Sequence, residues 1–278
     1  MTETPQFTHQ MITDAQSGDA EALEQIVRGI QDRVHRLAVR MMADPVLAQD
    51  ASQEILIRII TKLSTFRGEA KFSTWVYRIA TNYLLTARKV LARDPGLSFD
   101  MFEADLTEGL VDEAQAAPED HVMLNELRVR CTMAMLLCLD RDHRAAYVLG
   151  DVLELGQAEA AEVLEISPAN YRQRLARARG KVTEFTAKTC GVARKGAACS
   201  CPRRLPAAVA AGRVGARPDP MLAAAPDYAT TVQSARETEA ALVAAKLQRS
   251  TGPLGAPVDY ARAVLRLVEG VGDASHQT

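Results

Sequence analysis

The chain has few aromatic residues and no long apolar segment. Of its 278 residues one is Trp, six are Tyr and six are Phe, whereas 47% are hydrophobic. Cores are therefore expected to consist mainly of Leu, Ile, Val and Ala, which suits packed helices. No apolar run reaches the about 18 residues of a membrane helix. The N-terminus, MTETPQFTHQ, has no basic region followed by an apolar run. We expect no secretory signal, no membrane insertion and a cytoplasmic protein.

The sequence also lacks the common signatures of catalysis. It has no nucleotide-binding glycine loop, no Gly-x-Ser-x-Gly elbow and no evident pair of catalytic carboxylates. Its five histidines are scattered and form no metal-ligand pair. The five cysteines are expected to stay mostly reduced in the cytoplasm. We therefore expect a protein that is not an enzyme and requires no cofactor.

Charge is segregated along the chain, although the formal net charge is only −2. Residues 94–120 contain nine acids and no Lys or Arg, whereas residues 190–217 contain six bases and no acid. Affinity for phosphates follows the local patch rather than the total charge. The low net charge is thus compatible with nucleic-acid binding.

Hydrophobic periodicity predicts a first all-α domain over residues 20–92. One helix should cover residues 20–42, and a second, capped by Asp44, residues 46–63. A turn with Gly68 at a positive φ should lead to a third helix, capped by Ser73 or Thr74. Residues 1–18 are expected to be frayed.

This third helix and its turn carry a basic surface with aromatic side chains between the cations. Cations pair with phosphates and rings stack on unpaired bases, so the surface is typical of single-stranded nucleic-acid binding. The only tryptophan, Trp75, is assigned mainly to packing. The candidate contact residues are Arg67, Lys71, Tyr77, Arg78 and Asn82.

A second all-α domain is predicted over residues 119–188. An acidic linker, residues 93–118, should precede it and contain one short helix near Met101. Helices are expected over 119–139, 142–154, 157–164 and 167–188, and the short turn between the last two gives a helix-turn-helix motif. The last helix should bury Tyr171 and present amides and guanidiniums to a major groove. The candidate contacts are Asn170, Arg172, Gln173, Arg174, Arg177 and Lys181.

Residues 189–278 form an extension that is predicted to be partly helical. Residues 190–226 are expected to be irregular, and amphipathic helices are expected over 228–248 and 258–268. Cys131 and Cys138 share one helix face and are interpreted as buried structural residues. Cys190, Cys199 and Cys201 lie among Lys and Arg, which should lower their thiol pKa. Their spacing leaves a zinc or copper site, a disulfide and a sensory role open.

Six segments resemble the sigma factors of bacterial RNA polymerase, of the extracytoplasmic-function (ECF) type. DASQE (50–54), FRGEA (66–70) and TWVYRIATN (74–82) are similar to the region that binds polymerase and melts the −10 element. LDRDHR (139–144), AEAAEVL (158–164) and RLARAR (174–179) are similar to the region that reads the −35 element. The resemblance covers about residues 20–188, and similar cysteine-bearing tails occur on some ECF sigma factors. Glu165 stands where glycine is usual, so a left-handed conformation there would cost about 1 kcal/mol or more.

The resemblance implies a sigma factor with core RNA polymerase and promoter DNA as partners. It assigns polymerase binding to a helix face that grips a coiled coil in the largest subunits, namely Asp50, Gln53, Glu54, Ile57 and Arg58. An anti-sigma factor or a cis-acting C-terminal tail would regulate it. The alternatives are a conventional helix-turn-helix regulator with an N-terminal dimerisation or sensing bundle, and a thiol or metal enzyme. The first leaves the basic aromatic surface without a purpose, and the second lacks a partner base.

Overall fold

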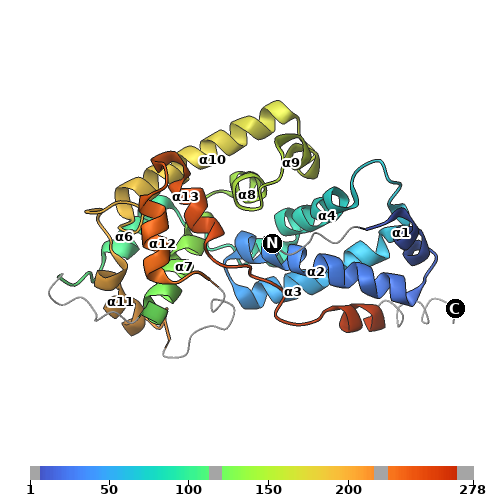
Figure 1. The fold of residues 1–278 in the computed structure, drawn as a ribbon, viewed down its shortest axis with the longest axis horizontal. Helices are drawn as coiled ribbons and strands as arrows, with labels where there is room; N and C mark the ends of the chain where they lie inside the picture. The colour runs from blue at the N-terminus through green and yellow to red at the C-terminus, as the bar shows by residue number, and fades with distance from the viewer. Residues whose placement is uncertain (1–6, 113–120, 216–224, 268–278) are drawn as a thin grey trace. The chain divides into compact units, whose positions relative to one another are not determined.

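The computed structural model describes residues 7–112, 121–215 and 225–267, which fold as two all-α units (Figure 1). Unit 1 contains Met1–Ala92, Ala161–Ile166 and Gly255–Thr278, and unit 2 contains Arg93–Ala160 and Ser167–Leu254. No β-strand occurs in these described ranges, where Cys190 and Cys199 form an isolated parallel bridge. No helix of the described chain is long and apolar enough to cross a membrane.

Unit 1 is built around one long amphipathic helix. Ile26, Val27, Ile30 and Val34 on this helix are fully buried, and each such side chain contributes about 1.5–3 kcal/mol of hydrophobic stabilisation. Asp44 caps the next helix with Pro45 as its first residue, as predicted. The helices of this part are α1 (His9–Gln16), α2 (Ala20–Met42), α3 (Pro45–Thr61), η1 (Leu63–Thr65), α4 (Phe72–Thr86) and α5 (Arg88–Leu91).

Two predictions for this unit are wrong. Residues 9–16 are not frayed but form α1, because Thr8 caps it and Gln16 donates hydrogen bonds to the carbonyls of η1 and its following turn. Helix α4 begins at Phe72, before the predicted caps, and its N-terminus has no side-chain cap. Burial of Phe72 against neighbouring rings fixes this start instead.

The end of the described chain packs against α2 and α3, and we call residues 255–267 the C-terminal strap. The backbone N–H groups of Ala256 and Tyr260 donate to the side chains of Asp32 and Gln31, both at 2.9 Å. Tyr260 is 2% exposed. Residues 261–267 are helical, within the predicted range 258–268. The strap therefore forms part of the unit 1 core.

Unit 2 contains the second helix of the helix-turn-helix motif and most of the extension. Helix α10 begins with Pro168 and is capped by Ser167, as predicted. A short helix falls within the acidic linker near Met101, also as predicted, and buries Phe102 beside Phe185. The helices are α6 (Phe99–Thr107), α7 (His121–Leu137), α8 (Arg141–Tyr147), η3 (Val148–Val152), α9 (Gln157–Val163, whose end belongs to unit 1), α10 (Pro168–Thr189), α11 (Cys201–Ala210), α12 (Tyr228–Arg236) and α13 (Ala240–Arg249).

The extension is more ordered than its composition indicates. Residues 190–226 are not irregular throughout, because α11 packs its apolar face against α7. The predicted single helix over 228–248 is divided into α12 and α13. Arg128, 2% exposed, donates to the side chain and carbonyl of Ser250, and Gln248 donates to the carbonyl of Thr132 at 2.6 Å. These buried hydrogen bonds make α13 an integral part of unit 2.

Candidate nucleic-acid interface

One side of α3 carries the polar residues that the resemblance assigns to polymerase binding, and we call it the docking face. Asp50 and Arg58 are exposed, and the other three members are partly exposed. The opposite side buries Ile55, Leu56 and Ile59 completely. The five predicted residues, Asp50, Gln53, Glu54, Ile57 and Arg58, therefore share one accessible side of the helix.

Lys89 and Tyr83, which the sequence did not assign to the docking face, lie beside it. Glu54 lies 3.2 Å from Arg58 and 3.8 Å from Lys89. Both cations lie over the ring of Tyr83, at 4.8 and 5.7 Å from its centroid. Tyr83 and the nearby acids Glu54 and Asp50 raise the pKa of Lys89. Exposed ion pairs of this kind contribute under about 1 kcal/mol each, so they can be exchanged for contacts with a partner.

A hollow of about 340 Å³ opens between η1 and α4. Gly68 adopts a φ of 77° in the turn that borders it, as the sequence predicted. Two cations and two rings line the hollow together, which combines phosphate pairing with base stacking in one place. Its lining residues are Thr65, Phe66, Arg67, Glu69, Ala70, Trp75 and Arg78.

Trp75 packs and also lines this hollow. Its ring lies 5.4 Å from that of Phe66 and 5.7 Å from that of Phe72, but the residue remains partly exposed. We predicted that Trp75 serves mainly in packing, and it does pack on two rings, but it also lines the hollow. Of the five predicted contacts, the hollow brings together Arg67 and Arg78. Lys71, Tyr77 and Asn82 do not line it.

Tyr77 is two positions from Trp75 and thus on another side of α4. It lies near Arg40 of α2, whose pKa burial lowers to about 10 while Tyr77 opposes that shift. Lys71 is exposed at the start of α4, and Asn82 is exposed near its end. The predicted contacts therefore form a surface along α4 rather than one pocket.

The recognition helix α10 has the two faces that the sequence predicted. Tyr171, Leu175, Ala178 and Val182 are all at most 3% exposed. On the other side, Arg174 is partly buried and lies 3.5 Å from Asp142. Glu165 in the turn has a φ of 54°, so the left-handed conformation is present without glycine. The exposed members of the predicted set are Asn170, Arg172, Gln173, Arg177 and Lys181.

Tyr171 fits into the core of unit 2 because Gly150 has no side chain. The Tyr171 hydroxyl donates to the carbonyl of Ala146 at 3.2 Å. A Cβ atom on Gly150 would lie 2.3 Å from the hydroxyl oxygen of Tyr171. Burial raises the pKa of Tyr171 to about 12, so its hydroxyl remains a donor. Beside it, Arg179 forms two bonds with the buried carboxylate of Asp151, at 2.5 and 2.7 Å.

The five cysteines are free thiols, and burial raises rather than lowers their pKa. The pKa is about 12 for Cys131 and Cys138 and about 11 for Cys199, and it is also raised for Cys190 and Cys201. The predicted activation by Lys and Arg is wrong because desolvation outweighs the cations. In the described residues no group of three or more His, Cys, Asp or Glu side chains could hold a metal ion.

Comparison with known proteins agrees with this arrangement. The family model "Sigma-70 region 2" matches residues 26–93, and "Sigma-70, region 4" matches residues 130–182. The ECF RNA polymerase sigma factor SigW of Bacillus subtilis (strain 168) is 34% identical over 173 residues, covering 60% of this chain and 90% of the relative. The chain belongs to the ECF sigma factor family.

This ECF sigma factor is also similar to the ECF RNA polymerase sigma-E factor of Escherichia coli (strain K12), at 30% identity over 179 residues, covering 63% of this chain and 92% of that one. A solved complex of the sigma factor RpoE with the anti-sigma factor NepR from Bartonella quintana shares 18% identity and a TM-score of 0.42, covering 58% and 94% of the two chains. As a sigma factor, the protein directs promoter-specific transcription initiation. It is not a conventional helix-turn-helix regulator with a sensing bundle.

Proposed function

We propose that this sigma factor divides initiation among the surfaces described above. Residues 20–92 form the domain that binds polymerase and melts the −10 element, with core RNA polymerase on the docking face. Residues 119–188 bind the −35 duplex through α10, and residues 93–118 connect the two. The observation that carries the proposal is the hollow of unit 1, where rings and guanidiniums line one cavity. The protein acts in the cytoplasm, with the polymerase it serves.

The hollow suits an unpaired base of the −10 element. Stacking on Phe66 or Trp75 would recover about 1–3 kcal/mol per base. Flipping a base costs a few kcal/mol, so the phosphate contacts of Arg67 and Arg78 are needed as well. Lys71, Tyr77 and Asn82 would extend this contact along α4. Several such contacts together hold the melted strand.

The exposed side of α10 suits the −35 duplex. Arg177 and Gln173 can reach base edges in a major groove, and Arg172 and Lys181 can neutralise phosphates. Arg174 is held near Asp142, so its guanidinium is oriented before DNA arrives. Asn170 lies in the first turn, where a recognition helix meets base edges.

We further propose that the C-terminal strap acts in cis on unit 1. Two observations support this proposal. The backbone of the strap donates hydrogen bonds to α2, and Tyr260 is buried beside α3, the helix of the docking face. An anti-sigma factor, such as the one bound by RpoE in the solved complex, is a second regulator of this surface. Zinc or copper on Cys190, Cys199 and Cys201 forms no part of the proposal, because among the described residues no group of three or more His, Cys, Asp or Glu side chains could hold a metal ion.

Reversing the charge of the docking face tests polymerase binding. Asp50→Lys combined with Glu54→Lys should abolish co-purification with core RNA polymerase and run-off transcription while leaving the circular dichroism unchanged. The matched control, Glu237→Lys with Glu239→Lys on exposed residues of unit 2, should retain both. A double variant of the docking face that still binds core polymerase would refute the assignment.

Permanganate reactivity of bubble thymines tests the melting surface. Arg78→Ala and Asn82→Ala also remove contacts of 3.0 Å to Glu162 and Glu165. Both variants should bind core polymerase normally but open the promoter poorly. Thr61→Ala, an exposed change on α3 outside the predicted contact set, is the control and should open it normally. Normal opening by both variants of α4 would show that melting occurs elsewhere.

A further inference from the structure

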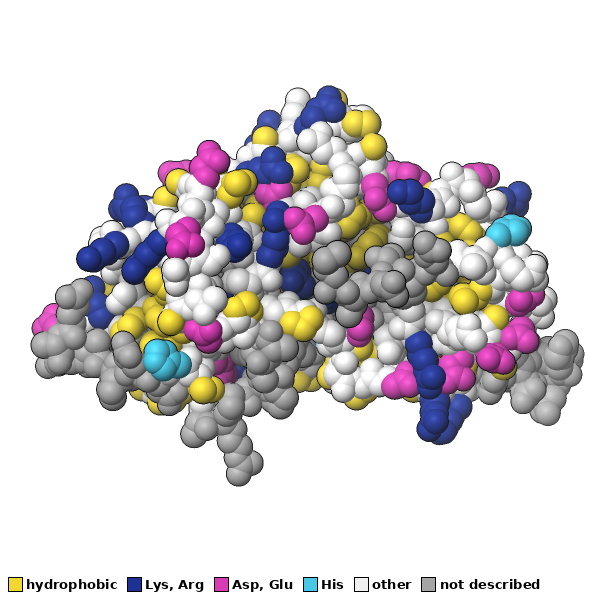
Figure 2. Space-filling view, in the orientation of Figure 1, with side chains coloured by type: hydrophobic (Ala, Val, Ile, Leu, Met, Phe, Trp, Pro, Cys, Tyr) yellow, Lys and Arg dark blue, Asp and Glu magenta, His cyan; other side chains and the backbone are white. Residues whose placement is uncertain are grey.

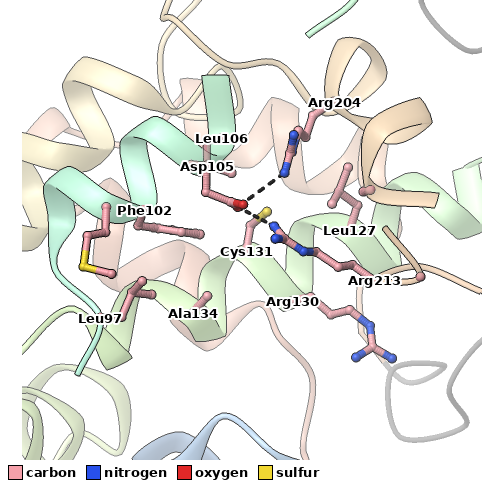
Figure 3. A pocket seen from close by; sticks show the side chains of 13 residues that line it. Leu97, Phe102, Asp105, Leu106, Leu127, Arg130, Cys131, Ala134, Arg204 and Arg213 are labelled. Atoms are coloured by element: carbon pink, nitrogen blue, oxygen red, sulfur yellow. Dashed lines mark hydrogen bonds and ion pairs between the residues drawn. The ribbon is translucent and has the colours of Figure 1, made fainter. Parts of the chain in front are cut away.

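A cavity of about 550 Å³ lies within unit 2, between α6, α7 and α11 (Figure 3). Its wall is mostly apolar and includes Leu97, Phe102, Leu106, Leu127 and Ala134. Cavities of this size and lining are typical of small-molecule sites. None of the residues proposed to bind polymerase or DNA lines it, so the proposed function leaves it without a role.

The polar groups of this cavity gather at one place. Arg204 and Arg213 both pair with the carboxylate of Asp105 (Figure 3), and the Arg204 contact is 3.3 Å. Arg204 is almost wholly buried, whereas 51% of the Arg213 side chain is exposed. The hydrogen bond and charge of Arg213, opposed by burial, lower the pKa of Asp105, which is therefore ionised. Glu108 adds a further acid nearby, and its backbone carbonyl accepts from Arg204.

The two guanidiniums carry more donors than one carboxylate can accept. A guanidinium has five N–H groups in a fixed fork. Arg204 divides its donors between Asp105 and the Glu108 carbonyl, but Arg213 reaches Asp105 through a single nitrogen. Arg130, also on the lining, pairs with the buried carboxylate of Glu126 at 2.8 Å. The exposed side of Arg213 is thus the place where a further anion would be recognised.

We propose that this cavity binds a small ligand with an apolar body and one carboxylate. The body fills the space between Phe102, Leu106 and Leu127, and the carboxylate accepts from Arg213 beside Asp105. The thiol of Cys131 points toward the cavity (Figure 3), but burial raises its pKa to about 12. Binding is therefore non-covalent. The walls come from the acidic linker, the first helix of the −35-binding domain and the extension, so one ligand contacts all three.

Competition between a fatty acid and its alcohol tests the proposal on the full-length protein. N-phenyl-1-naphthylamine, a neutral probe that fluoresces in apolar sites, reports occupancy, and decanoate and 1-decanol compete for it. A charge-assisted hydrogen bond favours the carboxylate over the hydroxyl, so decanoate should displace the probe at a concentration at least about tenfold lower than 1-decanol. Equal displacement by both, or absence of probe binding, would overturn the proposal.

Four variants locate the site. The measured quantity is the ratio of the 1-decanol and decanoate concentrations that displace the probe, and this ratio does not depend on any unfolded fraction. Arg213→Ala should bring the ratio close to one, and Asp105→Asn, which frees both guanidiniums, should raise it. Arg194→Ala removes an exposed arginine that does not line the cavity and should leave the ratio unchanged. Ala134→Phe should fill the cavity and abolish probe binding at unchanged helicity. A ratio that survives Arg213→Ala, or probe binding that survives Ala134→Phe, would place the ligand elsewhere. Probe displacement involves neither polymerase nor promoter DNA. A failure of the ligand proposal can therefore be distinguished from a failure of the proposed function.

Discussion

The backbone N–H of Tyr260 donates to Oε1 of Gln31 at 2.9 Å, joining residues 229 positions apart in the sequence. The Tyr260 hydroxyl lies 3.4 Å from the carbonyl of Gln49, the residue before Asp50 of the docking face. The strap therefore packs on α2 and on α3, and α3 is the helix that carries the docking face. Figure 2 shows Lys and Arg side chains and Asp and Glu side chains on the face of the molecule that it presents.

Removing the Tyr260 side chain should detach the strap. Tyr260→Ala leaves a cavity in the core of unit 1, and truncation of a buried aromatic residue costs about 3–5 kcal/mol. Amide hydrogen exchange of α2 and α3 should accelerate accordingly. Arg262→Ala, on the exposed side of the strap, should leave exchange unchanged. Equal protection in wild type and Tyr260→Ala would show that the strap is not bound in solution.

Local signals predicted the fold where neighbouring residues decide it. The bounds of α2, the caps Asp44 and Ser167, and the positive φ of Gly68 all follow from short stretches of sequence. The start of α4 did not, because burial of Phe72 outweighs capping there. The strap could not be predicted either, since its partners lie more than two hundred positions away.

The candidate site shows the same limit. The outward set on α10 follows from helical periodicity alone, and the structure confirms its exposure apart from the partly buried Arg174. By contrast, Lys89 and Tyr83 join the docking face only through the packing of α4 and α5 beside α3. The raised pKa of the thiols depends on α11 packing against α7, and composition indicated an irregular, solvated segment there.

Acid should destabilise unit 1 through His35. Burial, only partly offset by Asp32, lowers its pKa from 6.5 to about 4. Ser52 uses its hydroxyl proton on the carbonyl of Ala48, so Nδ1 of a neutral ring donates to Ser52 at 3.0 Å. The unfolded chain binds the proton more tightly. Stability is therefore complete above pH 6.5 and falls as the pH decreases toward 4.

Urea unfolding at two pH values measures this contribution. Between pH 7 and 5 the wild type should lose about 2 kcal/mol more than His35→Leu, which has no titrating ring. The comparison removes the effect of carboxylates that titrate in both proteins. Equal losses in the two proteins would show that His35 is accessible to protons in the folded state.

Gly150 and Tyr171 should be energetically coupled. Gly150→Ala forces its Cβ against the Tyr171 hydroxyl, and overpacking of this kind costs about 1–3 kcal/mol. Tyr171→Phe removes the obstructing oxygen at a cost of about 1 kcal/mol for the lost hydrogen bond to Ala146. The double variant should therefore be more stable than the sum of the single changes predicts. Additive free energies of unfolding would exclude the steric explanation.

Two arginines of α10 should separate base reading from charge. If Arg177 pairs with a guanine, Arg177→Ala should cost about 1–3 kcal/mol on −35 duplex and relax the preference at one base pair. Arg172→Ala, which removes a proposed phosphate contact, should weaken all duplexes alike and reduce the salt dependence by about one counterion.

Arg174 differs from both because its partner Asp142 would be left unpaired, so Arg174→Lys should retain more affinity than Arg174→Ala. Fluorescence anisotropy with duplexes substituted at each position, over a range of salt concentrations, measures all of these effects. If Arg177→Ala and Arg172→Ala give the same salt slope and the same base preference, α10 binds DNA through phosphates alone and the promoter sequence is read by other residues.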